Sequence, residues 1–277
     1  MMTALLGLII ILAIHAVRLD GGIDGVKFYL LPNFEKIQEV GFFKLITTAM
    51  NQAFFTLSIG MGSMMIFGSY IDKSRTLLGE SINIALLDTF VAIIAGLIIF
   101  PSCFAFNVEP DSGPSLIFIT LPNVFTSMKG GRIWGSLFFL FMTFACFSTI
   151  IAVFENIISF WIDMFGISRK KSVLINTIII LIASLPCVFG FNIWSGFQIF
   201  GQNVLGMEDF LVSNILLPVG SLVYLLFCVT KFGWGFDNYL DECNTGKGIK
   251  FSKALKPYFK YVLPVLVLIL IVQGFIK

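Results

Sequence analysis

Two glycines and two hydroxyl side chains follow one another near the middle of a long apolar stretch: Thr56, Ser58, Gly60 and Gly62. A glycine costs a helix about 1 kcal/mol relative to alanine. Membrane helices tolerate unwound backbone only where it is buried in protein or lines a cavity, and the carbonyls freed there can coordinate a cation. The pattern predicts either a broken helix at an ion site or close helix packing through small residues, and on this feature alone both stay open.

A second polar group interrupts a later apolar stretch. Ala145, Ser148 and Thr149 are spaced i, i+3 and i+4, which places them on one helix face. Sodium is a hard cation that prefers oxygen ligands, and a carbonyl and two hydroxyls can supply them. The alternative is that both hydroxyls bond back to carbonyls one turn earlier. The spacing alone favours this alternative.

Asp88 is the only acidic residue in the sequence of the apolar run 82–105. An acid at membrane depth costs about 2.5 to 3.5 kcal/mol even on the milder insertion scales, so it needs a partner or a function. The plain alternative is an acid near the inner end of its helix that reaches water. The sequence therefore indicates that Asp88 has a partner, and it leaves this alternative open.

Long apolar segments must position these groups. Of the 277 residues, 57% are hydrophobic and 12% are charged, against roughly 45–50% and about 25% in soluble domains. Since a helix needs about 20 residues to cross a bilayer, the sequence predicts one all-α domain over residues 1–277, a polytopic transmembrane helical bundle. Its seven expected spans are 3–17, 42–71, 82–105, 133–165, 173–191, 210–230 and 258–276.

The charges between the spans predict the orientation. Basic residues follow the second, fourth and sixth spans, which must face one side, and Lys and Arg are enriched in cytoplasmic loops. We therefore expect the N-terminus inside and Lys277 outside. The loops 20–39 and 107–131, rich in glycine, proline and aromatic residues, are expected to hold short helices. A net charge of +2 without a basic stripe argues against nucleic acid, and no hydrolase, metalloprotease or nucleotide-binding signature points to an enzyme.

Four strings, in this order along the chain, resemble the neurotransmitter:sodium symporter family and specifically its bacterial amino-acid transporters: 52–62 (QAFFTLSIGMG), 69–70 (SY), 118–122 (FITLP) and 209–210 (DF). The resemblance implies a partial inverted-repeat transporter fold with one discontinuous helix and a site at the membrane midplane. The seven spans resemble the family's fifth to eleventh helices, the fifth entered partway. The first four are expected to be absent, and Met1 is not the expected natural start of this fold.

The resemblance also implies roles for individual residues. It implies sodium ligation by Thr56, Asp88, Ala145 (through its carbonyl), Ser148 and Thr149, and a substrate site lined by Phe55, Thr56, Ser58, Met61, Thr149 and Val153. Gly60 and Gly62 correspond to the hinge of the discontinuous helix, and Asp209 and Asp163 to the outer and inner gate carboxylates. Asp88 falls where the family usually has a sodium-binding asparagine. Because many relatives also need chloride, a fixed negative charge at this position predicts chloride-independent transport.

These inferences predict a function. We expect sodium-coupled symport of a neutral amino acid across the cytoplasmic membrane by alternating access, with sodium ions, the amino acid and membrane lipid as partners. The chain as given is expected not to transport alone, since half of the family's site lies in the absent helices. The alternative is a non-transporting fragment of a truncated or split gene, which needs a separately encoded N-terminal segment.

Overall fold

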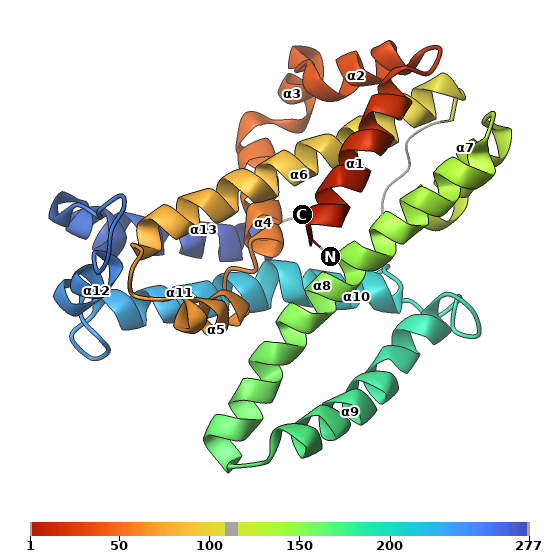
Figure 1. Cartoon of the computed structure of the whole chain (residues 1–277). Helices are drawn as coiled ribbons and strands as arrows, with labels where there is room; N and C mark the ends of the chain where they lie inside the picture. The colour runs from red at the N-terminus through yellow and green to blue at the C-terminus, as the bar shows by residue number, and fades with distance from the viewer. Residues whose placement is uncertain (1, 109–115, 276–277) are drawn as a thin grey trace. The chain divides into compact units, whose positions relative to one another are not determined.

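The computed structural model describes residues 2–108 and 116–275, which are helical and contain no β-strand (Figure 1). Five segments in this part of the chain are long and apolar enough to cross a membrane: α6 (Leu77–Ala105), α8 (Gly131–Phe165), α9 (Arg169–Gly190), the segment Val204–Val229, and the segment Lys253–Phe275. The fourth joins α10 (Val204–Leu211), η2 (Val212–Leu216) and α11 (Leu217–Val229), and the fifth ends in α13 (Leu263–Phe275). The prediction of an all-α, polytopic membrane protein is confirmed.

Shorter helices account for the rest of the described chain. α1 (Met2–Val17) and α2 (Gly22–Leu30) are apolar enough for one span together, but a bend of 113° separates them. α4 (Phe42–Thr56) and α5 (Ser63–Tyr70) are the two halves of one interrupted apolar segment, which confirms the predicted discontinuous helix. The count of seven spans stays a prediction, since none of these four helices reaches 18 residues. Ile276 and Lys277 lie outside the described residues.

Both loops predicted to hold short helices contain them. The first holds α2 and α3 (Phe34–Val40), and the second holds η1 (Leu116–Thr120) and α7 (Leu121–Ser127). The prolines and glycine before η1, at positions 110, 113 and 114, lie outside the described residues.

The chain divides into two compact units, and the first comprises residues 1–39 and 84–150. Side chains of α1, α6, α7 and α8 form its core: Leu5, Ile9, Leu12, Ile98, Cys103, Leu121, Val124, Phe125, Phe138 and Phe141. Helix α2 lies directly on α6, because a β-carbon at Gly25 would come within 2.6 Å of the Cα atom of Pro101. Glycine therefore sets how closely these two helices approach.

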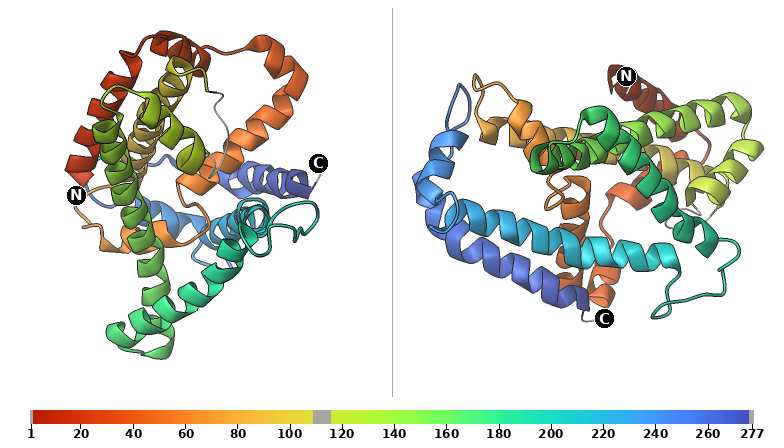
Figure 2. Two further views of the ribbon diagram at one scale, coloured as in Figure 1. Left: turned by 90° about the vertical axis from the view of Figure 1, so that its right-hand side faces the viewer. Right: turned by 90° about the horizontal axis from the view of Figure 1, so that it is seen from below.

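The second unit comprises residues 40–83 and 151–277. Within it α11 and α13 lie side by side (Figures 1 and 2). The basic loop after α11 folds into α12 (Phe236–Cys243). This helix packs on the end of α11 through Val229, Phe236, Leu240, Cys243 and Phe251. The π-helical turn η2 ends two residues before Pro218, which has no N–H to donate the regular hydrogen bond to residue i−4 of an α-helix.

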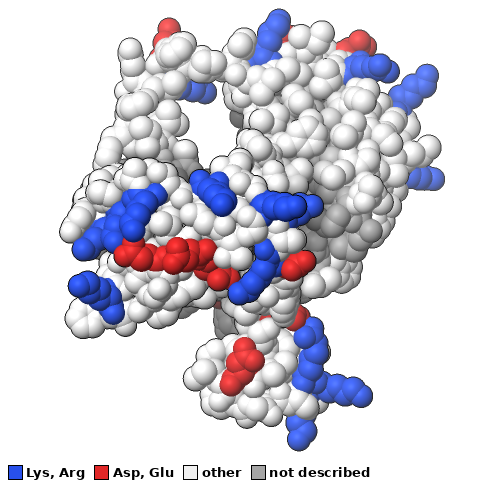
Figure 3. Space-filling model, turned by 60° about the vertical axis from the view of Figure 1, so that its left-hand side comes forward, with Lys and Arg blue, Asp and Glu red and all other residues white. Residues whose placement is uncertain are grey.

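On the face drawn in Figure 3, residues other than Lys, Arg, Asp and Glu cover most of the surface. Large apolar side chains are exposed along the described helices; on α9 alone these include Leu174, Ile178, Leu181, Ile182 and Leu185. Apolar patches of this extent are rare on water-soluble monomers. Their presence agrees with helices that contact lipid.

Candidate ion and substrate site

The break between α4 and α5 covers residues 57–62, and its backbone is left-handed at three positions. The φ angle is 52° at Ser58, 88° at Gly60 and 85° at Gly62. L-residues with a β-carbon rarely adopt this conformation, whereas glycine does so without steric cost. The two glycines singled out in the sequence therefore occupy positions that need glycine, and they end the helical hydrogen bonding.

Unwinding leaves backbone oxygens free. The carbonyl groups of Thr56, Leu57, Ile59 and Gly60 accept no hydrogen bond from any described residue. Unwound backbone inside a membrane protein is found where such groups line a cavity or bind a ligand. The break thus presents carbonyl oxygens, which are suitable ligands for a hard cation.

Main-chain contacts hold the break against α11. A β-carbon at Gly60 would lie 2.2 Å from the carbonyl oxygen of Leu217, and one at Gly220 would lie 2.4 Å from the carbonyl oxygen of Gly60. Real β-carbons do not approach other atoms so closely. The absence of a side chain at Gly60 and at Gly220 is therefore what lets the two backbones touch.

Asn156 of α8 binds the break from a second direction. Its amide nitrogen donates to the carbonyl oxygen of Met61 at 2.8 Å. A β-carbon at Gly62 would lie 3.2 Å from the same amide and 3.0 Å from the Tyr224 hydroxyl of α11. The sequence prediction missed Asn156, although a carboxamide in the apolar run 133–165 was the signal that could have indicated it.

The remaining predicted substrate residues of the second unit lie on or near this break. Phe55 and Thr56 end α4. Phe55 is 44% exposed, and the Thr56 hydroxyl donates weakly to the Ala53 carbonyl at 3.4 Å. Val153 lies on α8 one turn before Asn156. Asn156 contacts the break directly, so α8 brings Val153 to the same region of this unit.

The three oxygens predicted on α8 do form one cluster. The Ser148 hydroxyl donates to the Ala145 carbonyl at 2.7 Å, and the Thr149 hydroxyl donates to the same oxygen at 3.2 Å. These are the bonds of the alternative interpretation, in which hydroxyls bond back along the helix. A hydroxyl that donates its proton keeps its lone pairs, so the Ser148 and Thr149 oxygens stay available as ligands, whereas the Ala145 carbonyl already accepts both bonds.

Asp88 lies well inside α6, at the twelfth of its 29 residues. At 1.5 Å per residue this is about 17 Å from the helix start. Its half-buried carboxylate makes no hydrogen bond or ion pair with the described part of the chain. The predicted sodium ligands are divided between the two units. The first unit contains Asp88, Ala145, Ser148 and Thr149, and the second contains Thr56, so the structure describes these two groups of ligands separately.

The predicted gate carboxylates are exposed. Asp209 accepts a hydrogen bond from the Ser213 hydroxyl at 3.1 Å, and Asp163 forms no ion pair with the described residues. On α8, eight residues before Asp163, Glu155 forms an ion pair with Arg169: its carboxylate accepts two hydrogen bonds from the guanidinium. The same carboxylate accepts a third bond from the Tyr70 hydroxyl at 3.0 Å.

This network ties α5, α8 and α9 together, and the sequence prediction missed it as well. Paired bonds between a guanidinium and a carboxylate are among the stronger polar contacts in proteins. An acid inside an apolar run needs a partner, so Glu155 was itself the available signal.

Comparisons with known proteins agree with these features. Residues 1–277 match the profile of the Sodium:neurotransmitter symporter family. An uncharacterized sodium-dependent transporter of Haemophilus influenzae is 31% identical over 267 residues, which are 95% of this chain and 56% of that protein. The uncharacterized sodium-dependent transporter YhdH of Bacillus subtilis is 32% identical over 231 residues, 83% of this chain and 50% of that protein.

A solved structure is also similar. The crystal structure of MhsT in complex with L-phenylalanine superposes with a TM-score of 0.84 at 32% identity, covering 98% of this chain and 60% of that one. The chain therefore spans about half the length of the curated relatives it matches.

Proposed function

The chain belongs to the Sodium:neurotransmitter symporter family, and from this premise we propose that it serves sodium-coupled symport of a neutral amino acid by alternating access. The observation that carries the proposal is the break at residues 57–62, whose free carbonyl oxygens lie beside hydroxyl groups in an apolar helix. In the first unit, the oxygen cluster of Ala145, Ser148 and Thr149 and the acid Asp88 supply ligands of the same kind. Sodium prefers oxygen ligands of this type.

The substrate class follows from the predicted substrate residues. Phe55, Met61 and Val153 are apolar, and Thr56, Ser58 and Thr149 add only hydroxyls, so no charged group among them could pair with a charged side chain of the substrate. The similar transporter MhsT was crystallised in complex with L-phenylalanine. Both observations support a neutral amino acid with an apolar side chain.

Asp88 supports transport without chloride. Asp88 stands where the family usually has a sodium-binding asparagine, and in this proposal its carboxylate takes the place of chloride. We propose that uptake persists when gluconate replaces chloride.

The topology is part of the same proposal. Seven spans, in the order α1, broken α4–α5, α6, α8, α9, α10–α11 and the segment ending in α13, would place the N-terminus in the cytoplasm. The basic start of α9, at Arg169, Lys170 and Lys171, would then face inside. In the variant Lys170→Cys, the introduced thiol should react with an impermeant maleimide only in inside-out vesicles of the cytoplasmic membrane. Labelling of this thiol in intact cells would contradict the topology.

Uptake by proteoliposomes tests the function. The purified chain, alone and co-expressed with the segment encoded upstream of it, should accumulate labelled L-phenylalanine or L-leucine only under a sodium gradient, with choline as the control cation. Uptake that appears only with the upstream segment supports the alternative that a separate N-terminal part is required. Accumulation that does not depend on sodium contradicts the proposal.

Two threonines of α8 give a matched pair of variants. Thr149→Val removes a proposed ligand, whereas Thr143→Val removes an equally exposed hydroxyl that bonds back to the Phe139 carbonyl at 2.7 Å. Loss of one good oxygen contact to a cation should weaken sodium activation about tenfold or more. Thr143→Val should leave it unchanged, and an equal effect of both variants would show that Thr149 has no special role.

A further inference from the structure

A short closed loop, residues 244–251, lies between α12 and the segment Lys253–Phe275 of the second unit. The Asn244 side-chain amide donates to the Phe251 carbonyl oxygen at 3.0 Å, and the Phe251 N–H donates to the Asn244 side-chain oxygen at 2.6 Å. The Phe251 ring is buried in the cluster that packs α12 on α11. These contacts fix the two ends of the loop, and residues 247–250 form its exposed tip.

The connection between α5 and α6 holds this tip from one side. The Lys247 N–H donates to the Ser74 carbonyl oxygen at 2.8 Å, and the Thr76 N–H donates to the Lys247 carbonyl oxygen at 3.4 Å. A β-carbon at Gly246 would lie 2.6 Å from the Arg75 backbone nitrogen, so the two backbones touch. The tip therefore has a defined position, in which Arg75 and Lys247 lie opposite each other on a main-chain bridge.

The charges around the loop divide into a neutralised group and a free group. Residues 230–260 contain six lysines and three acidic residues, and all three acidic residues belong to α12. Ion pairs with these acidic residues involve three basic side chains: Lys73, Lys253 and Lys256. Lys247 and Lys250 of the tip are exposed and form no ion pair within the described part of the chain. The tip therefore presents two positive charges that α12 does not neutralise.

Large apolar side chains are exposed among these lysines. Ile249 lies between the two lysines of the tip and is 57% exposed. At the end of α11, Phe232 follows Lys231 and is fully exposed. Lysines beside apolar and aromatic side chains are typical of a membrane surface, where the ammonium group reaches the lipid phosphate and the apolar atoms enter the acyl region. A soluble anion or a nucleic acid would pair with the charges but leave Ile249 and Phe232 in water.

The neighbouring helices place the tip at a bilayer surface. The segment Val204–Val229, before the loop, and the segment Lys253–Phe275, after it, are both long and apolar enough to cross a membrane. When two successive segments cross, the residues that join them, 230–252, lie at one face of the bilayer. The tip is thus next to lipid headgroups in either orientation of the chain.

We propose that the loop tip binds the headgroup of an anionic phospholipid of the surrounding bilayer, of the phosphatidylglycerol class. The ammonium groups of Lys247 and Lys250 pair with the lipid phosphate, and the Ile249 side chain lies against the upper part of an acyl chain. Phosphatidylcholine has the same phosphate, but its quaternary ammonium cancels the negative charge. The proposal does not depend on the transported substrate or ion.

Native mass spectrometry of the purified chain in detergent, titrated with dioleoyl phosphatidylglycerol or dioleoyl phosphatidylcholine, tests the proposal. A basic residue near an anionic lipid surface contributes about fivefold in affinity, so two should give phosphatidylglycerol an advantage of about 25-fold. The double change Lys247→Gln and Lys250→Gln should remove this preference. The matched change Lys170→Gln and Lys171→Gln replaces two adjacent exposed lysines at the start of α9 and should leave the preference unchanged.

Two further measurements separate the lipid from a free anion and cover the case in which the double variant does not fold, as judged by circular dichroism. Ile249→Ser keeps both lysines, and it should weaken binding of both lipids while the preference between them persists. Free glycerol phosphate in large excess should not displace the lipid, because it has no acyl chain to contact Ile249.

Four results overturn the proposal. The first is equal affinity of the unaltered chain for the two lipids, and the second is an equal loss of preference in both double variants, which would indicate general attraction to any basic loop. The third is unchanged binding of both lipids by Ile249→Ser. The fourth is displacement of the lipid by glycerol phosphate, which would identify a free anion as the ligand.

Discussion

Replacing Gly60 by alanine tests whether the break depends on main-chain contact with α11. The added methyl group would lie 2.2 Å from the Leu217 carbonyl oxygen and 2.9 Å from the Ser221 nitrogen, at a residue whose φ is 88°. Gly68, in α5 of the same interrupted segment, has no atom within 4 Å of its β-carbon position. The two substitutions are chemically identical and differ only in their surroundings.

The magnitudes follow from these surroundings. A left-handed conformation costs an alanine about 1–2 kcal/mol, and forcing a methyl into a packed site costs about 1–3 kcal/mol. Gly60→Ala should therefore destabilise the second unit by roughly 2–5 kcal/mol. Gly68→Ala should instead stabilise α5 by up to about 1 kcal/mol, because alanine is the better helix former.

The buried thiol of Cys243 in the second unit provides the assay. The purified chain is heated in detergent with a maleimide, and labelled peptides are identified by mass spectrometry, which separates Cys243 from the exposed Cys146. Cys243 should react at a clearly lower temperature in Gly60→Ala than in the unaltered chain. If Gly60→Ala reacts at the same temperature as Gly68→Ala, the reasoning about the backbone contact is refuted.

Three further predictions concern charged groups. Glu155→Gln and Arg169→Gln should be non-additive in unfolding titrations, with a coupling energy of about 1 kcal/mol, and strict additivity would show that their ion pair contributes nothing. Asp88→Asn should cripple uptake or create a chloride requirement, and normal chloride-free uptake by this variant would reject the role of its charge. The Lys256 ammonium beside Asp237 holds the pKa of that exposed carboxyl below its usual range. Its stabilisation of α12 is therefore present above about pH 4 and is lost as the pH falls through the lowered pKa. Hydrogen exchange in α12, corrected for intrinsic rates, should rise over that range in the unaltered chain but not in Asp237→Asn.

The position of the break could be predicted from sequence because it depends on local chemistry. Gly60 and Gly62 can adopt a left-handed backbone without steric cost, and both are left-handed here. Its partners could not be predicted in the same way. Asn156 lies 95 residues from Met61, and no spacing rule connects two groups at that separation.

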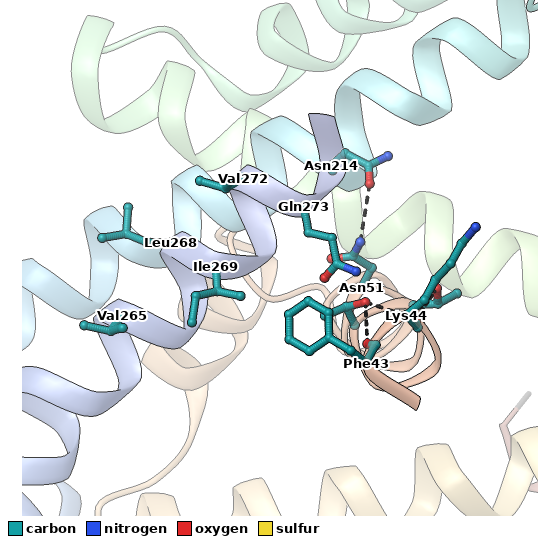
Figure 4. A pocket seen from close by; sticks show the side chains of 12 residues that line it. Phe43, Lys44, Asn51, Asn214, Val265, Leu268, Ile269, Val272 and Gln273 are labelled. Atoms are coloured by element: carbon teal, nitrogen blue, oxygen red, sulfur yellow. Dashed lines mark hydrogen bonds between the residues drawn. The ribbon is translucent and has the colours of Figure 1, made fainter. Parts of the chain in front are cut away.

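Helix starts were less predictable, and for a physical reason. α6 begins at Leu77 rather than at 82, and α9 at Arg169 rather than at 173. Hydropathy measures only the apolar part of a helix, whereas backbone hydrogen bonding continues through charged first turns such as the one containing Lys170 and Lys171. The hydrogen bond between Asn51 of α4 and Asn214 of η2 (Figure 4) was equally unpredictable, since both are ordinary polar residues until two separate elements meet.

The contact between Gly60 and Gly220 has a mechanical consequence. Side chains at an interface absorb small displacements by changing rotamer, but two touching backbones have no such freedom. When α11 shifts sideways, residues 57–62 must therefore move with it, and their free carbonyl oxygens move as well. If the proposed ion binds at the break, a compound that displaces α11 should change the affinity for that ion without contacting any of its proposed ligands.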